Sequence, residues 1–259
     1  MVDEADYVYG IHAVAALVDK GADRIHRLYH TEIEKHVRRA RVVQAAKAAG
    51  VVVQQVQRHE LDARLPGAKH QGLLAEATAS SPTSFSELIL RLNADPDAFV
   101  LVLDGVQDPG NLGACLRSAA AAGVDAVIVP KDRASDLTGA ARRSASGAAE
   151  LVPVVQVPNL ARALRALQAA GLTVVGADGG ATTSLPRADL RRPLALVAGS
   201  EGQGLRHLTA EHCDVLVKIP LPGALTTLNV SVAVGILLYE ACRDLEVAGP
   251  TVASAATSP

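Results

Sequence analysis

Aromatic residues are scarce in this chain of 259 residues, which contains four Tyr, two Phe and no Trp. RNA-recognition motifs and single-strand-binding folds stack bases on aromatic side chains, so this scarcity argues against both kinds of surface. It also means that the core must consist mainly of aliphatic side chains. Hydrophobic residues form 49% of the chain and charged residues 20%, which is typical of a folded protein rather than a disordered one.

An excess of charge of either sign is also absent, because 25 Lys and Arg balance 27 Asp and Glu to a net charge of −2. This balance excludes a protein that holds polyanions by overall basicity alone, so any contact with nucleic acid must come from a local patch. The stretch 24–41 holds six Arg and Lys against two Glu. We expect it to contact RNA through Arg24, Arg38, Arg39 and Arg41, and the alternative is a solvated helix face.

The three cysteines, Cys115, Cys213 and Cys242, form no CxxC pair and have no His at metal-ligand spacing beside them. We therefore expect reduced thiols and no bound metal. Long apolar runs are missing too, because stretches such as 99–106 end well short of the roughly 20 residues that a membrane span needs. The first residues lack the basic and apolar parts of a secretory signal, so we expect a cytoplasmic protein that does not span a membrane.

The order of strand-like and helix-like segments along the chain predicts two domains. Residues 7–78 read as a small α/β unit, whereas from Phe99 apolar strands alternate with helices, one of them over 140–149, as a parallel sheet covered on both faces requires. Turn residues at 80–84 and 95–97 separate the two parts. The predicted boundaries are 1–80 for the first domain, 81–97 for a linker, 98–245 for the parallel-sheet domain and 246–259 for a flexible tail.

The first candidate site follows the apolar run that ends at Asp104. Residues 104–113, DGVQDPGNLG, form a loop that leads into a helix, and open α/β sheets bind ligands in such loops at the carboxyl ends of strands. We expect Asn111 to cap this helix and Arg117 to reach the same mouth with its long side chain. Taken alone, the pattern also fits an ordinary capped helix with a surface arginine.

A second loop, residues 196–205 with the sequence LVAGSEGQGL, again follows an apolar run. Three glycines within six residues let backbone amides approach a ligand closely. Their spacing is not GxGxxG, and the phosphate loop of ATPases and GTPases is absent from the chain. Glu201 disfavours a bare phosphate and suits a cation, hydroxyl groups or an arginine. A structural turn with an exposed glutamate is the alternative.

A third loop, residues 219–233 with the sequence IPLPGALTTLNVSVA, ends a strand with two prolines and a glycine. Thr227, Asn229 and Ser231 are the polar residues of the step that opens the next helix. They are candidate ligands, although caps and turn hydrogen bonds would account for them as well. The helix over 228–241 is apolar on most sides, so we expect it to be buried.

The order, spacing and wording of the three motifs resemble the SpoU/TrmH family of knotted, S-adenosylmethionine-dependent RNA ribose 2′-O-methyltransferases. NLGACLRSA is similar to the family's first motif, LVAGSEGQGL to its second and IPLPGALTTLNVSVA to its third. The N-terminal segments YGIHAV and KHQGLLAE match as well, so the resemblance covers nearly the whole chain. The wording between the motifs is most similar to members that methylate a guanosine ribose in bacterial 23S ribosomal RNA, and the resemblance implies that function.

The resemblance also implies a fold and partners. It implies an α/β protein with a small N-terminal RNA substrate-binding domain similar to ribosomal protein L30e, followed by a SPOUT parallel-sheet domain with a C-terminal trefoil knot. It further implies a homodimer that acts on large-subunit ribosomal RNA and binds S-adenosylmethionine at the knot, with no metal. The implied cofactor-binding residues are Gly199, Ile219, Leu221 and Leu228. The implied catalytic or substrate positions are Asn111, Arg117, Glu201, Thr227 and Asn229.

One position departs from the family's pattern, because the third motif reads Thr227-Leu228-Asn229 where relatives usually have Ser-Leu-Asn. Threonine keeps the hydroxyl and adds a methyl group. The general base that has been proposed for the family corresponds to Arg117, but a guanidinium that stays protonated cannot accept a proton. We expect Arg117 to stabilise the developing alkoxide and to hold a neighbouring phosphate, with Glu201 and Asn229 fixing its orientation.

Three other functions share some of these features. A family member that acts on transfer RNA or on another ribosomal nucleotide would carry the same motifs and differ in its first domain. A non-catalytic RNA-binding or ribosome-assembly factor could retain the fold, although the intact polar motif residues argue against it. A nucleotide-dependent oxidoreductase is disfavoured by the missing GxGxxG motif.

Overall fold

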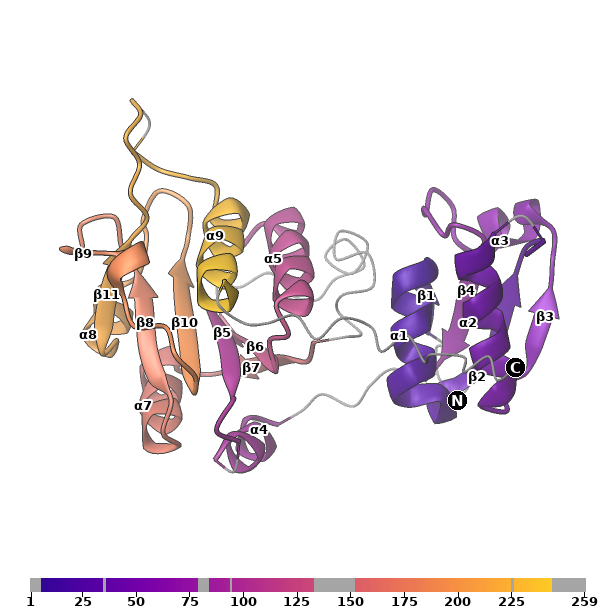
Figure 1. Cartoon of the computed structure of the whole chain (residues 1–259), viewed down its shortest axis with the longest axis horizontal. Coiled ribbons are helices and arrows are strands. Elements are labelled where there is room, and N and C mark those ends of the chain that lie inside the picture. The colour runs from indigo at the N-terminus through magenta and orange to yellow at the C-terminus, as the bar shows by residue number, and fades with distance from the viewer. Residues whose placement is uncertain are drawn as a thin grey trace, which may run out of the picture.

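The computed structural model describes residues 6–34, 36–78, 84–93, 95–132, 152–224 and 226–243, which fold into two α/β units (Figure 1). Each unit has its own sheet and its own hydrophobic core. The helix expected over 140–149 and the tail expected over 246–259 lie outside the described residues.

The first unit is built on a four-stranded sheet. Its elements are β1 (Asp6–Tyr9), α1 (Ile11–Gly21), the 3-10 turn η1 (Ala22–Arg24), β2 (Ile25–His30), α2 (Val37–Ala48), β3 (Val53–Gln55), α3 (Arg58–Arg64) and β4 (Leu73–Ala77). The strand order is β1-β4-β2-β3, antiparallel except for the parallel pair of β2 and β3. Side chains alternate across the sheet, so Leu28 and Leu73 join the core under α1 and α2, whereas Tyr29 and Leu74 pack with the short α3.

Helix α4 (Phe85–Leu92) lies within the stretch 81–97 that the sequence predicted as a linker. Ser84 begins the helix with a capping box, which satisfies amide groups at its first turn. Leu88 and Leu92 lie four residues apart on one side of the helix and are buried in the core of the second unit. The expected linker therefore contains a helix that belongs to the second unit, because this apolar side has a sheet to pack against.

The second unit contains a seven-stranded sheet in which the described strand pairs are parallel. In spatial order the strands are β7 (Val154–Val157), β6 (Ala126–Pro130), β5 (Phe99–Asp104), β10 (Leu194–Gly199), β8 (Thr173–Ala177), β11 (Val215–Lys218) and β9 (Thr183–Ser184). The predicted parallel sheet is thus confirmed. Strands β5 and β6 are wholly buried, as their near-continuous Val, Leu and Ile runs indicate.

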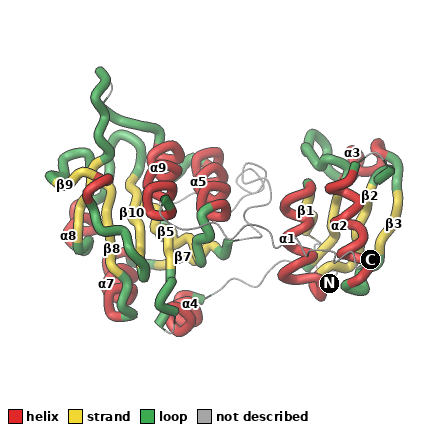
Figure 2. The backbone as a smooth tube through the Cα atoms, in the orientation of Figure 1, coloured by secondary structure: helices red, strands yellow, loops and turns green. Residues whose placement is uncertain are grey.

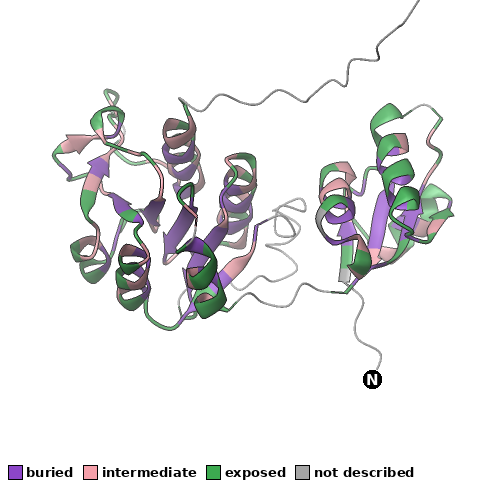
Figure 3. Ribbon diagram, turned by 60° about the horizontal axis from the view of Figure 1, so that its bottom comes forward, coloured by how far each residue is buried: buried purple, intermediate pink, exposed green. Residues whose placement is uncertain are grey.

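Helices cover both faces of this sheet (Figure 2). One face carries α5 (Pro109–Ala121) and α9 (Val230–Cys242), and the other carries α4, α7 (Leu160–Ala169) and α8 (His207–Glu211), while the 3-10 turn η3 (Leu185–Arg187) follows β9. Successive residues of β5 divide between the two layers, because Leu101 packs with α5 and α9 and Val102 packs with α4 and α7. Figure 3 shows the strands buried between helices whose outer sides are exposed.

Helix α9 is more exposed than its apolar sequence predicted. Its inner side joins the core of the sheet, but Val232, Ile236 and Tyr239 are 50%, 36% and 69% exposed. These three residues are spaced four and three positions apart, so they form one stripe on the outer side of the helix, which we call the α9 stripe. The expectation that this helix is buried therefore holds for its inner side and fails for the α9 stripe, because an apolar residue can lie in the core or on the surface.

The loops that follow β5, β10 and β11 lie at one edge of the sheet. In the parallel register Gly199, the last residue of β10, pairs with Asp104, the last residue of β5. The three sequence motifs are therefore brought to the same edge, where the carboxyl ends of parallel strands meet. The trefoil knot that the resemblance implies stays a prediction.

Candidate active site

Three polar side chains, one from each sequence motif, meet at this edge of the sheet. Asn229 Nδ2 donates hydrogen bonds to Asn111 Oδ1 at 3.0 Å and to Glu201 Oε2 at 3.1 Å. The bond to Asn111 joins residues that are 118 positions apart in the chain. Three of the five predicted catalytic residues therefore form one group, which we call the polar cluster.

The side-chain amide of Asn229 has one orientation that satisfies its neighbours. Its Oδ1 accepts hydrogen bonds from Ser231 N at 2.9 Å and from the Ser231 hydroxyl at 2.6 Å, so its Nδ2 must face the two oxygens of the polar cluster. Asn229 is also the N-cap of α9. Asn229 therefore has both of the roles considered for the third motif, because the same side chain caps α9 and joins the polar cluster.

Helix α5 begins three residues earlier than the sequence predicted. Its N-cap is Asp108, with Pro109 as the first helical residue, and Asp108 Oδ1 accepts a hydrogen bond from Asn111 N at 2.7 Å. The expectation that Asn111 caps this helix was wrong, because the carboxylate before the proline takes that role. Asn111 consequently lies in the first turn, where its side chain is available to Asn229.

Arg117 lies on the outer side of α5 and is exposed. It lines an open groove between α5 and α9 together with Ser118, Ser231 and Val232. Within the described parts of the chain its guanidinium has no hydrogen-bond or ion-pair partner. The expected orientation of Arg117 by Glu201 and Asn229 is therefore not found, because those two side chains bond to each other. Ser231 connects the groove to the polar cluster through its bond to Asn229.

A cavity of about 300 Å3 lies beside the polar cluster. It is formed by the loops after β8, β10 and β11 and by the start of α9. Its lining includes the four residues predicted to hold the cofactor and two of those predicted to be catalytic, namely Gly199, Ile219, Leu221, Leu228, Glu201 and Thr227. Asn111, Arg117 and Asn229 are not among its lining residues, so the structure divides the predicted site among a cavity, the polar cluster beside it and the groove that Arg117 lines.

The loop that follows β10 forms one wall of the cavity through the run 199–204. Ser200 and Gly204 exchange two backbone hydrogen bonds, of 3.1 and 3.0 Å, which fold the loop back on itself. A Cβ at Gly199 would lie 2.0 Å from the backbone of Gly204, and Gly202 and Gly204 have φ angles of +83° and +66°. The glycines of the second motif are therefore required by this fold of the loop.

Acidic residues supply the charge of the described cavity lining. Glu201 and Asp178 carry carboxylates, and the described lining residues include no Lys, Arg or His. Asp178 follows β8, where its Oδ1 accepts a hydrogen bond from Gly180 N at 2.7 Å. Sequence reasoning missed Asp178, although an acidic residue at the end of an apolar strand was a signal that could have found it. The cavity therefore favours a ligand with positive charge.

A buried ion pair supports the same loop and was also missed. Asp104, at the end of β5, has a side chain that is fully buried, and it pairs with Arg206, which follows the loop. Asp104 Oδ2 accepts a hydrogen bond from Arg206 N at 3.1 Å, while Oδ1 contacts the guanidinium. The signal was present in the sequence, because a carboxylate that ends a buried strand needs a cationic or hydrogen-bonding partner.

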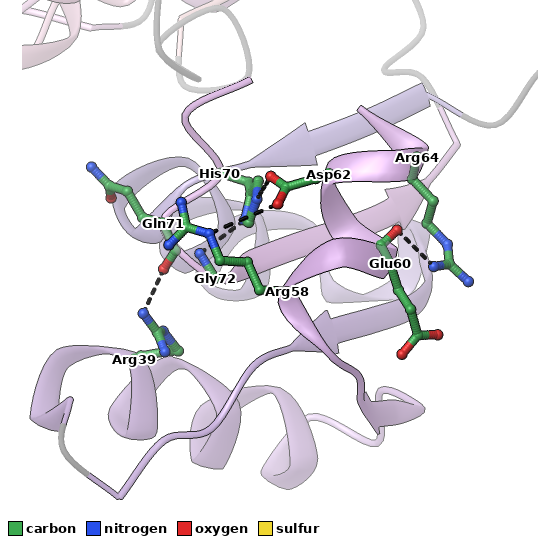
Figure 4. A network of polar contacts seen from close by, with 8 residues as sticks. All are labelled: Arg39, Arg58, Glu60, Asp62, Arg64, His70, Gln71 and Gly72. Atoms are coloured by element: carbon green, nitrogen blue, oxygen red, sulfur yellow. Dashed lines mark hydrogen bonds and ion pairs between the residues drawn. The ribbon is translucent and has the colours of Figure 1, made fainter. Parts of the chain in front are cut away.

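The basic stretch of the first unit divides into buried and exposed arginines. Arg39 is only 8% exposed, and its guanidinium donates hydrogen bonds to Thr31 Oγ1 and Glu32 O at 2.8 and 2.7 Å. It also donates a hydrogen bond to Gln71 O at 2.8 Å (Figure 4). Burial, followed by the positive charge of Arg58, lowers the pKa of Arg39 from its ordinary value. The interpretation of Arg39 as a surface RNA ligand is therefore corrected, because its donors join two loops of the unit.

The other three arginines of the predicted patch differ in exposure. Arg38 and Arg41 are exposed on α2, whereas Arg24 is half-buried. The Arg24 side chain lies against Gly21, since a Cβ there would come within 2.8 Å of Arg24 Nε. Arg38 and Arg41 therefore remain as the accessible cations of the predicted patch.

A buried histidine holds the loop that Arg39 contacts (Figure 4). His70 is 1% exposed; its Nδ1 accepts a hydrogen bond from Gly72 N at 3.0 Å, and its Nε2 bonds with Asp62 Oδ1 at 2.9 Å. Since Nδ1 is an acceptor, Nε2 carries the hydrogen. Gln71, between the two, has a φ of +52°, a conformation that non-glycine residues seldom adopt. The loop is therefore fixed on both sides by buried polar groups.

The described residues contain no group of three or more His, Cys, Asp or Glu side chains that could hold a metal ion. No helix in the same residues has the length and apolar character to cross a membrane.

Both units match known sequence families. The SpoU rRNA methylase family matches residues 98–239, and the family described as RNA 2′-O ribose methyltransferase substrate binding matches residues 7–83. Among curated proteins, the 23S rRNA (guanosine-2′-O-)-methyltransferase RlmB of Escherichia coli (strain K12) is 45% identical over 93% of this chain and 99% of its own length. RlmB of Vibrio vulnificus (strain CMCP6) is 47% identical over 92% of this chain and 97% of its own length.

The fold matches solved structures as well. The AdoMet-bound rRNA methyltransferase from Sinorhizobium meliloti is 25% identical, covers 93% of this chain and 88% of its own, and superposes with a TM-score of 0.70. Likeness thus extends over both units at the levels of sequence and fold. Since the family match covers more than half of the chain and the curated relatives cover nearly all of it, this chain belongs to the SpoU rRNA methylase family.

Proposed function

We propose that this protein transfers a methyl group from S-adenosylmethionine to the ribose 2′-hydroxyl of a guanosine in 23S ribosomal RNA. The relatives from E. coli and V. vulnificus are named for this activity and align with the chain over more than nine-tenths of its length. The observation that carries the proposal is the polar cluster, in which Asn229 joins one residue from each of the other two motifs beside a cavity. A ribosomal substrate would place the protein in the cytoplasm.

The cavity is suited to S-adenosylmethionine in size and charge. Its volume of about 300 Å3 matches the smaller ligand pockets of proteins. The cofactor carries an ammonium, a sulfonium and a carboxylate, and its net positive charge is complementary to Asp178 and Glu201. When bound, it supplies a methyl group that its sulfonium makes electrophilic.

Four residues of the lining would hold the cofactor. Gly199 exposes its backbone at the wall of the cavity, and Ile219, Leu221 and Leu228 offer apolar side chains. Apolar walls with a few backbone donors and acceptors are the usual surroundings of a purine ring. Thr227 adds a hydroxyl at the same wall, and we assign it to the orientation of the acceptor ribose.

Arg117 is assigned to the acceptor side of the reaction. Its cation lies in the groove next to the cavity. Ser231, which lines the same groove, is hydrogen-bonded to Asn229 of the polar cluster. A cation at this place would stabilise the alkoxide that develops as the hydroxyl loses its proton, and it would hold a phosphate of the RNA. Because a guanidinium stays protonated, Arg117 is not the proton acceptor. The polar cluster would fix the first turn of α9, and the acceptor ribose would lie against that turn.

The first unit would hold the RNA through exposed cations of α2. Arg38 and Arg41 are both exposed and lie three positions apart, on the same side of the helix. Two arginines at this spacing suit contacts with phosphates, which position an RNA without reading its sequence. Arg39 supports this surface from within, because its hydrogen bonds hold the loop at Thr31 and Glu32 that precedes α2.

We further propose that the protein is a homodimer joined through the α9 stripe. Val232, Ile236 and Tyr239 expose large apolar surface on one helix side, and contiguous exposed apolar surface marks protein interfaces. Tyr239→Arg should place a charge in that interface and shift the protein to monomers. Sedimentation of the wild type and this variant at matched concentration tests the dimer, and a wild-type monomer would contradict it.

Methyl transfer in vitro tests the proposed function. The purified protein is mixed with radiolabelled S-adenosylmethionine and with 23S ribosomal RNA or transfer RNA transcribed without modifications. The proposal predicts that label enters 23S ribosomal RNA and is recovered as 2′-O-methylguanosine after nuclease digestion. Label in transfer RNA alone would support a family member with a different substrate. Failure to bind the cofactor, measured by calorimetry, would support a non-catalytic RNA-binding factor.

A further inference from the structure

The cavity wall formed by the loop 200–205 has two attachments to the sheet. At its start the loop continues β10, whose last residue, Gly199, pairs with Asp104 of β5. At its end the chain returns to the same Asp104, which accepts a hydrogen bond from Arg206 N at 3.1 Å. One carboxylate at the end of β5 therefore lies between the two ends of the loop.

Asp104 requires its pairing with Arg206 because its carboxylate is buried. Its side chain is fully buried, and a buried carboxylate is costly unless it is paired and hydrogen-bonded. Oδ2 accepts a hydrogen bond from the backbone amide of Arg206, and Oδ1 accepts one from its guanidinium. The two donors come from one residue, so Asp104 fixes both the main-chain position and the side-chain direction of Arg206.

The ion pair also determines where the loop can lie. Ser200 and Gly204 are joined by backbone hydrogen bonds, and the backbone of Gly204 packs directly on Gly199. With the chain held at Arg206, the loop has little freedom to move away from the cavity. Glu201, which bonds to Asn229, is carried on the same loop.

We propose that Asp104 and Arg206 are positioning residues for the S-adenosylmethionine site. They hold the loop 200–205 against the end of β5, which sets the width of the cavity and presents Glu201 to the polar cluster. Neither residue lines the cavity, so both act through the loop. This inference rests on the proposed function, because it concerns the affinity for that cofactor.

Asp104→Asn separates the role of the pair from simple packing. The side chain keeps its shape, but an amide has one acceptor oxygen where the carboxylate has two, so it cannot serve both the backbone amide and the guanidinium of Arg206. The loop should then detach while the sheet stays intact. Arg206→Gln is the complementary change and should be more damaging, because it leaves the buried carboxylate without its cation.

Calorimetry with S-adenosylmethionine and hydrogen exchange of the loop amides test the inference on the full-length protein. For Asp104→Asn we expect Kd and KM for the cofactor to rise about tenfold, and kcat at saturating cofactor to fall by a smaller factor because the loop also carries Glu201. Amides of 200–205 should exchange faster than in the wild type. Combining Asp104→Asn with Arg206→Gln should recover part of the stability lost in Arg206→Gln, because no buried charge remains unpaired.

Asp125→Asn is the matched control. Asp125 Oδ2 accepts a hydrogen bond from Phe99 N at 2.8 Å at the opposite edge of the same sheet, so its loss should affect stability and leave Kd for the cofactor unchanged. Wild-type affinity for the cofactor in Asp104→Asn would overturn this inference, and so would an equal loss of affinity in Asp125→Asn. Neither result would affect the proposed function. A wild-type protein that does not bind S-adenosylmethionine would overturn the proposed function, and this inference with it.

Discussion

In the second unit, residues predicted from three separate loops meet at one edge of the sheet, whereas in the first unit residues predicted from one basic stretch separate. Asn111, Glu201 and Asn229 are far apart in the chain and form a hydrogen-bonded cluster. Arg38 and Arg39 are neighbours in the chain, yet the first is exposed and the second is buried. Position at a strand end thus predicted a shared site, while a local excess of charge did not predict exposure.

The physical reason lies in what each signal constrains. The carboxyl ends of neighbouring parallel strands must lie at one edge, so loops that follow such strands converge whatever their sequence separation. A run of arginines on a helix points in all directions around the helix axis. Arg39 therefore turns toward the loop at Gln71, while Arg38, one position earlier, turns outward.

The largest expected effect is the loss of methyl transfer when the cation of Arg117 is removed. Arg117→Ala should lower kcat about a hundredfold to a thousandfold, because a positioned donor to a developing oxyanion contributes that much. Cofactor affinity should stay near the wild-type value, since Arg117 does not line the cavity. Single-turnover methylation of 23S ribosomal RNA and calorimetry with S-adenosylmethionine measure the two quantities.

Arg117→Lys distinguishes the electrostatic role of this cation from a role as general base. A lysine keeps the positive charge but loses a proton more readily than an arginine. Near-normal turnover that rises with pH through the ionisation range of a lysine would contradict the electrostatic role and favour the base.

The next largest effect is expected at the residue that joins the three motifs. Asn229→Ala should lower kcat about tenfold to a hundredfold, because Asn111 and Glu201 lose their common donor, and it should lower the free energy of unfolding by about 1 kcal/mol through the lost N-cap. Turnover and urea unfolding measure the two effects.

Asn159→Ala provides the matched control for Asn229→Ala. Asn159 caps α7 by accepting a hydrogen bond from Arg162 N at 2.9 Å, and it does not line the cavity. Its loss should cost similar stability with turnover unchanged. Equal losses of turnover in both variants would show that Asn229 acts only as a cap.

A smaller pair of effects should separate the buried and exposed arginines of the first unit. Arg39→Ala should lower the free energy of unfolding by about 2 to 3 kcal/mol, because three acceptors of part-buried hydrogen bonds lose a charged donor. Arg38→Ala and Arg41→Ala should leave stability unchanged, and each should reduce the slope of log affinity against log salt by about one if it removes one phosphate contact.

Thermal unfolding and RNA binding at several salt concentrations measure these effects. Unchanged salt slopes in both exposed variants would remove α2 from the RNA surface.

The last prediction concerns cysteine, which occurs only in the second unit. Burial raises the pKa of the Cys115 thiol to about 12 from 9.0, and burial with the negative charges of Asp214 and Asp104 raises that of Cys213 to about 12. Both thiols should therefore resist alkylation at pH 8 until the unit unfolds. The unfolded thiols lose protons first, so the free energy of unfolding should fall as the pH rises from 9 toward 12.

Mass spectrometry after iodoacetamide treatment locates the labelled thiols with and without denaturant. Arg39→Ala should leave the labelling of Cys115 and Cys213 unchanged in the folded protein, since its damage is confined to the first unit. Fast labelling of Cys115 in the native wild type would contradict the burial of that thiol.

Much of the second unit could be predicted from sequence for identifiable reasons. Runs of Val, Leu and Ile indicated buried parallel strands, and glycines beside Glu201 indicated a loop close to a ligand. The roles of Asp104 and Arg206 could not be predicted as a pair, because their contact depends on the register that brings β10 beside β5.

The remaining differences have the same origin in tertiary contacts. Asn111 is not the cap of α5, because Asp108 precedes a proline that starts the helix. Helix α4 lies within the expected linker, because Leu88 and Leu92 find an apolar face that only the folded sheet provides. The exposed α9 stripe looks like core in the sequence, since apolar spacing is the same for a core and for an interface.

The most direct test of the central claim is a comparison of 23S ribosomal RNA from cells with and without this protein, by nuclease digestion and mass spectrometry. The proposed function predicts that one 2′-O-methylguanosine is lost without the protein and is restored by the wild type but not by Arg117→Ala. An unchanged methylation pattern of 23S ribosomal RNA in cells that lack the protein would contradict it.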